Sequence, residues 1–115
     1  MARWWLVLLA LALALGAAAC GEDLGGGPGN TIQVSVQDNV FSPAQLTVPI
    51  NSTVTFVWGG MNPHNVTYFA GPPPLPANSF TITSGIFRTD FSRAGTFDYV
   101  CTLHPGMDGR IIVTP

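Results

Sequence analysis

The chain has 115 residues, enough for one domain, and only 9% of them are charged, against about a quarter in an average protein. Four basic residues cannot build the clustered positive surface that phosphates require, so we exclude nucleic acid as a partner. A hydrophobic content of 47% with a net charge of −2 excludes disorder as the state of the whole chain.

The amino-terminal segment has the composition of an export signal. Arg3 supplies a positive charge, an apolar run extends from Trp4 to Leu15, and small residues occupy Gly16 to Ala19. The 16 residues from Trp4 to Ala19 are fewer than the roughly 20 that span a bilayer. We therefore favour a signal peptide over residues 1–19 rather than a transmembrane anchor, and we expect the protein to be exported.

Cys20 follows the small residues directly, in a position that resembles the lipobox of bacterial lipoproteins, whose cysteine is acylated. Ala17 stands where that pattern usually has Leu, and the alternative is ordinary cleavage after Ala19, which leaves a free thiol. We favour lipid attachment at Cys20, because an exposed unpaired thiol is a liability in an oxidising compartment. The Gly-rich residues 20–29 then tether the domain to a membrane. The expected location is the periplasm or the outer face of the bacterial cytoplasmic membrane.

Residues 30–115 have the pattern of a series of short strands. Apolar and polar residues alternate from Ile32 to Val36, a period of two that is typical of a half-buried strand. The segment from Phe41 to Pro43 interrupts this run. Further strands are predicted over residues 46–50, 54–58 and 66–69.

The second half of the domain continues in the same way. The prolines between Gly71 and Pro76 predict a loop, because proline cannot donate to a sheet ladder. Four more strands are predicted over residues 80–83, 86–91, 96–101 and 110–114. About eight strands and no helical period predict an all-β fold, an antiparallel sandwich or small barrel. A hydrophobic core of this size gives only marginal stability by itself, and a bound metal can add to that stability.

Cys101, His104 and Met107 form a C-x-x-H-x-x-M loop between two predicted strands, and His64 follows Asn62-Pro63 at the start of another. Two such loops can meet at one end of a sandwich. Thiolate, thioether and imidazole together suit copper, and two His, one Cys and a long axial Met are the donors of blue copper sites. Zinc does not normally take Met, and iron–sulfur clusters need more thiolates. The alternative is that each residue is structural: a buried thiol, a loop histidine and a core methionine.

Two further motifs carry a resemblance to a known family. The segment from Pro63 to Val66 matches the first-ligand motif of the cupredoxins, and Gly95 to Cys101 resembles their approach to the copper cysteine. Over residues 31–115 the chain is similar to the plastocyanin, pseudoazurin and amicyanin group, and its C-T-x-H-P-x-M loop is most similar to amicyanin. The resemblance implies a Greek-key β-sandwich with one copper ion. It also implies that His64, Cys101 and His104 are the strong ligands. Met107 is implied to be the weak axial ligand.

The resemblance also implies roles for residues around the ligands. Asn65 is similar to the Asn that ties the two ligand loops together, and its expected partner is Thr102. Leu103 stands where amicyanin-like loops have Pro, so a backbone N–H is available there. If that N–H points at the Cys101 sulfur, it withdraws electron density and raises the reduction potential.

In the family the second histidine reaches the surface through an apolar patch, so we expect His104 to be the electron port. The candidate patch residues are Met61, Pro63, Leu103 and Pro105, with the proline loop of residues 72–76 as a further candidate. Three arginines and four aspartates follow residue 30, so charge steers partners only weakly. We expect a monomer with transient redox protein partners.

The leading hypothesis is therefore an exported blue copper protein that carries single electrons in the cell envelope. It is not expected to be an enzyme, because both histidines and Cys101 are already used and no coordination position remains for a substrate. One alternative is an envelope protein for copper storage, delivery or sensing. Another is a metal-free, adhesion-type sandwich.

Overall fold

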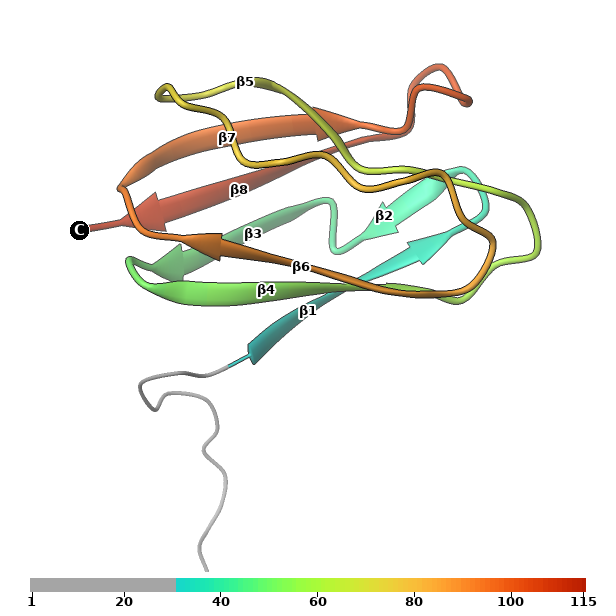
Figure 1. Ribbon diagram of the computed structural model, residues 1–115, viewed down its shortest axis with the longest axis horizontal. Helices are drawn as coiled ribbons and strands as arrows, with labels where there is room; N and C mark the ends of the chain where they lie inside the picture. The colour runs from blue at the N-terminus through green and yellow to red at the C-terminus, as the bar shows by residue number, and fades with distance from the viewer. Residues whose placement is uncertain (1–30) are drawn as a thin grey trace, which may run out of the picture.

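The computed structural model describes residues 31–115 as a sandwich of two four-stranded sheets (Figure 1). The strand orders are β2-β1-β4-β6 and β3-β8-β7-β5. Within these residues there is no helix that is long and apolar enough to cross a membrane. The predicted signal peptide, the tether and Cys20 lie outside the described residues. The strands are β1 (Thr31–Gln37), β2 (Val40–Ser42), β3 (Gln45–Pro49), β4 (Ser52–Trp58), β5 (Thr67–Ala70), β6 (Gly85–Phe91), β7 (Gly95–Val100) and β8 (Asp108–Thr114).

Alternating apolar side chains build the core between the two sheets. In β4, Val54, Phe56 and Trp58 point inward and are buried, which is the pattern that the two-residue period of a strand produces. Phe97 and Tyr99 of β7 face them from the other sheet and are buried as well. The predicted all-β sandwich is therefore confirmed.

The structure has as many strands as predicted, but one predicted strand does not form and an unpredicted one takes its place. Residues 40–42, read from the sequence as an interruption, form β2, because Asp38 and Asn39 make a two-residue turn that folds it onto β1. Residues 80–83 do not form a strand. Only Ile82 pairs there, in an isolated bridge with His64. Pro63, the residue before His64, has no N–H with which to extend the pairing.

The sheets are mixed, which corrects the expectation of antiparallel sheets. β1 pairs with β4 in parallel, and β3 pairs with β8 in parallel. The reason is that β3 belongs to the opposite sheet, so the chain crosses between layers before β4 returns beside β1 in the same direction. The remaining strand pairs are antiparallel.

Three connections lie together at one end of the sandwich, on the right in Figure 1. They are the β1–β2 turn, the loop from β4 to β5 and the loop from β7 to β8. Hydrogen bonds from the backbone of Met61 and Asn62 to Asp38 join the first two connections. This end of the molecule carries the residues that the sequence singled out for metal binding.

Both tyrosines of the chain lie in the core. The way in which they titrate at alkaline pH therefore tests the fold. Burial raises the pKa of Tyr68 and of Tyr99 above the ordinary value of about 10. The unfolded chain therefore releases these protons first, so their contribution to stability is complete below about pH 10 and is lost as the pH rises further.

We expect tyrosinate absorbance to appear in one steep step that coincides with the loss of circular dichroism from the sheets. The measurement is an alkaline titration that follows both signals in the same sample. A gradual rise of tyrosinate absorbance centred near pH 10, with the fold retained, would show that the two rings are not buried as described.

Candidate metal centre

His64 is placed by backbone contacts on both sides of its loop. Its N–H donates to Ile82 O at 3.0 Å, and its carbonyl accepts from Ile82 N at 3.1 Å. The same carbonyl also accepts from the Trp58 indole at 3.1 Å. The His64 side chain is completely buried, so its ring is held inside the end of the sandwich.

The loop from Cys101 to Met107 is closed by its own backbone. Cys101 N donates to Met107 O at 3.0 Å, and Met107 N donates to His104 O at 3.1 Å. Between them, His104 N donates to Cys101 O at 3.4 Å. Gly106 has a φ of 84°, in the region that favours glycine, and so lets the loop turn back toward β8. These contacts hold the three predicted ligands of the loop around one point.

The two loops bring the donor atoms together. One ligand atom each from His64, Cys101 and His104 lies within 4.8 Å of the others. The two Nδ1 atoms are 3.1 Å apart, and Cys101 Sγ lies 3.8 Å from His64 Nδ1 and 3.4 Å from His104 Nδ1. Met107 is buried, with 2% of its surface exposed. The four side chains predicted from the sequence are thus arranged as a metal site.

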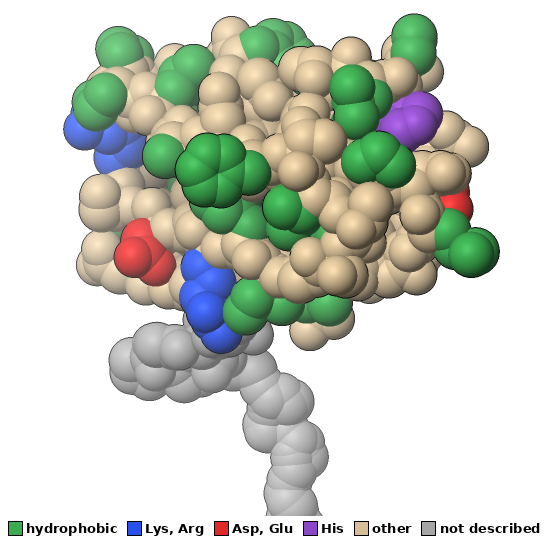
Figure 2. Space-filling model, turned by 45° about the vertical axis from the view of Figure 1, so that its right-hand side comes forward, with side chains coloured by type: hydrophobic (Ala, Val, Ile, Leu, Met, Phe, Trp, Pro, Cys, Tyr) green, Lys and Arg blue, Asp and Glu red, His purple; other side chains and the backbone are tan. Residues whose placement is uncertain are grey.

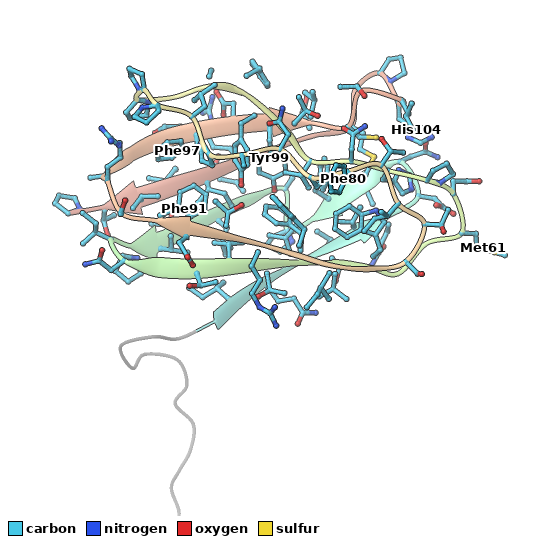
Figure 3. The ribbon with its side chains drawn as sticks, viewed as in Figure 1. Met61, Phe80, Phe91, Phe97, Tyr99 and His104 are labelled. Atoms are coloured by element: carbon cyan, nitrogen blue, oxygen red, sulfur yellow. The ribbon has the colours of Figure 1, made fainter. Side chains whose placement is uncertain are left out.

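The two histidines differ in exposure. His64 is fully buried, whereas His104 is only half-buried, at the outer edge of the molecule (Figure 3). The histidine surface coloured purple in Figure 2 therefore belongs to His104, and green apolar side chains lie around it. His104 is the ligand through which the site reaches the surface.

The chemistry of this donor set fits copper. A thiolate and a thioether are soft donors and imidazole is borderline, a combination that serves both Cu(I) and Cu(II). Structural zinc sites draw on Cys, His and carboxylate and do not use a buried methionine such as Met107. Cys101 is a free, buried cysteine, so its sulfur is available as a ligand.

Asn65 joins the two loops that carry the donors. Its Nδ2 donates to Thr102 Oγ1 at 2.8 Å, and its Oδ1 accepts from Thr102 N at 3.1 Å. Nδ2 also donates to Thr81 Oγ1, and Oδ1 accepts from Thr67 Oγ1. The structure therefore brings together Asn65 and Thr102, the pair expected from the sequence.

Leu103 does not make the contact considered for it. Within residues 31–115, the polar groups within hydrogen-bond distance of Cys101 Sγ are the two imidazoles, and the Leu103 N–H is not among them. Leu103 is a central residue of the turn that His104 N closes onto Cys101 O. Its side chain is half exposed instead.

The four residues expected to line an apolar patch, Met61, Pro63, Leu103 and Pro105, are all exposed. Phe80, with 87% of its surface exposed, lies between the middle of the sandwich and the end that carries His104 (Figure 3); sequence reasoning placed it in a strand and missed its exposure. The proline loop does not belong to this surface. Leu75 and its neighbours line a pocket with Arg93 and Phe97, at the opposite end of β7 from Cys101.

Sequence reasoning also missed Asp38, whose Oδ1 lies 2.9 Å from His64 Nε2. The Asp38-Asn39 pair between two apolar runs is a signal for a turn, but 26 residues separate it from His64. No local pattern in the sequence connects the two.

Comparison with known proteins agrees with this arrangement. The model of the family described as copper binding proteins, plastocyanin/azurin family, matches residues 29–114. Amicyanin-alpha of Methylorubrum extorquens is 29% identical over 110 residues, which cover 89% of this chain and 85% of that protein. Amicyanin of Paracoccus versutus is 30% identical over 95 residues, covering 75% of this chain and 67% of that protein.

Solved structures show the same likeness. A purple cupredoxin from Nitrosopumilus maritimus has a TM-score of 0.65 and 26% identity, over 72% of this chain and 99% of that one. A reduced Cu(I) form of an amicyanin variant has a TM-score of 0.64 and 26% identity, over 78% of this chain and 85% of that one.

Proposed function

The chain belongs to the plastocyanin/azurin family of copper-binding proteins, and from this membership we propose that it carries single electrons as a type 1, or blue, copper protein. The observation that carries the proposal is the meeting of His64, Cys101 and His104 donors within 4.8 Å, beside the buried Met107. In the proposed site the first three would hold copper as the strong ligands, and Met107 would be the weak one. Bound copper supplies a one-electron couple between Cu(II) and Cu(I).

The surrounding residues keep the donors in place during electron transfer. Cys101 is fixed by its backbone bond to Met107, and His64 by its bonds to Ile82. Asn65 links the two loops through Thr102. Because these bonds hold both loops, the same donor positions would serve both oxidation states, which would keep the reorganisation on electron transfer small.

The half-buried His104 is the proposed port for electrons. Around it we propose a docking surface made of Met61, Pro63, Leu103 and Pro105. An apolar surface of a few side chains suits brief encounters with redox proteins rather than a permanent complex. Because few charges are available to steer a partner, association should depend only weakly on salt.

We further propose that the protein acts as a carrier without an enzymatic activity of its own and works as a monomer. All four donors are assigned to one copper, so no coordination position is left for a substrate. The apolar run before Ala19 and the following Cys20 support export and lipid attachment in the periplasm or at the outer face of the cytoplasmic membrane.

The test of the function is the visible and EPR spectrum of the copper-loaded protein, followed by a redox titration. We expect an intense absorption band toward the red end of the spectrum, narrow copper hyperfine splitting and a reversible one-electron couple with fast self-exchange. Tight Cu(I) binding without the intense Cu(II) band would instead support copper storage or delivery. Copper that changes neither colour nor melting temperature would exclude both functions.

A further inference from the structure

Asp38 lies in the turn between β1 and β2 and contacts the loop that carries His64. Its carboxylate accepts hydrogen bonds from the backbone N–H groups of Met61, at 3.1 Å, and Asn62, at 3.0 Å. It also lies 2.9 Å from His64 Nε2. Asn39 follows with a φ of 68°, a left-handed conformation that Asn adopts readily, so the turn itself positions Asp38.

Gly60 permits this close approach. A β-carbon at position 60 would overlap the carboxylate and the backbone nitrogen of Asp38, which no larger side chain could avoid without moving the loop. The turn and the loop are therefore shaped on both sides so that the carboxylate reaches His64.

The carboxylate decides which ring nitrogen of His64 carries the proton. Its oxygens accept hydrogen bonds from the backbone N–H groups of Met61 and Asn62, as an ionised aspartate does at neutral pH. An ionised carboxylate only accepts hydrogen bonds, which makes Nε2 the protonated nitrogen of the neutral ring. Nδ1 then keeps a free lone pair, and it faces Cys101 Sγ and His104 Nδ1.

On the basis of the copper site proposed above, we propose that Asp38 is a positioning residue that fixes His64 as an Nδ1 ligand and strengthens its donation to copper. A negatively charged partner on Nε2 makes an imidazole a more basic ligand. A more basic ligand favours Cu(II), the ion of higher charge, over Cu(I). The Asp38 carboxylate thereby lowers the reduction potential of the site.

Asp38→Asn tests the inference, because the amide oxygen can still accept hydrogen bonds while the charge is removed. We expect the affinity for Cu(II), relative to Cu(I), to fall by about 10- to 100-fold. The potential rises accordingly, by about 59 mV for each tenfold change in a one-electron couple. Asp90→Asn is the matched control: it removes the same charge from an exposed carboxylate that accepts from Thr53 on β4, and it should leave the potential unchanged.

An unchanged potential in Asp38→Asn, or an equal shift in both variants, would overturn the inference. If the wild-type protein shows the blue site and Asp38→Asn leaves its potential unchanged, the inference fails and the proposed function stands. If the wild-type protein shows no blue site, the proposed function fails.

A second measurement needs neither copper nor a variant. Nitrogen-15 NMR of the metal-free protein, at a pH where the ring is neutral, should show His64 protonated on Nε2. His104 is the internal reference, because it has no carboxylate contact within the described residues. A His64 ring protonated on Nδ1 would reject the role of Asp38, whatever the variant does.

Discussion

Replacing Cys101 with serine should abolish the intense visible absorption of the copper-loaded protein. That absorption requires a thiolate bound to copper, and a serine hydroxyl stays protonated at neutral pH and cannot take its place. The loop should keep its shape, because the bonds that close it use the backbone of Cys101 and not its sulfur. The change therefore removes one donor and leaves the other three in place.

The measurement compares the absorption spectra of the copper-loaded variant and wild type, with circular dichroism of both to confirm that the sheets are intact. Leu103→Ala is the matched control, since it alters the same loop at a half-exposed side chain that is not a proposed ligand, and it should keep the band. A folded Cys101→Ser protein that retains the intense band would show that the sulfur is not the donor responsible.

The largest expected loss of stability follows from Phe56→Ala in the metal-free protein. The Phe56 ring is completely buried and packs edge-on against Tyr99, with ring centroids 5.3 Å apart, and beside Phe87 at 6.2 Å. Removing it leaves a cavity between the two sheets and should lower the free energy of unfolding by about 3–5 kcal/mol. For a domain whose total stability is about 5–15 kcal/mol, this is a large fraction.

Phe80→Ala provides the comparison, because it is the same substitution at a ring with 87% of its surface exposed. Its effect should lie within about 0.5 kcal/mol. Urea unfolding of both variants gives the two values, and the metal-free form is needed because bound copper would stabilise the folded state by itself. Similar losses in the two variants would mean that the described core is wrong.

The strands could be predicted from the sequence to the extent that alternation marks a half-buried segment. Residues 54–58 and 96–100 show this pattern, and both are central strands. Alternation does not say which strands pair, so the parallel pairing of β1 with β4 was not foreseen. Residues 80–83 alternate too, but a strand needs a partner, and only Ile82 found one.

The residues of the site likewise fall into those that the sequence could predict and those that it could not. Cys101, His104 and Met107 are close in the chain, so their spacing alone predicted that they meet. His64 needed the resemblance to a family as well, because 37 residues separate it from Cys101. Asp38 could not be found, since its contact with His64 depends on how a turn and a loop from distant parts of the chain pack together. A contact that depends on how distant segments pack together produces no local pattern in the sequence.

The direction of β1 determines where a membrane tether would join the sandwich relative to His104. The strand begins at Thr31 and ends next to the Asp38 turn, so the chain enters the sandwich about 20 Å, one strand length, from the copper-site end. In the lipid-anchored protein that we propose, the entry point is the side tied to the bilayer. His104 would then lie at the end away from the tether, where a diffusing protein could reach it without contacting the tether.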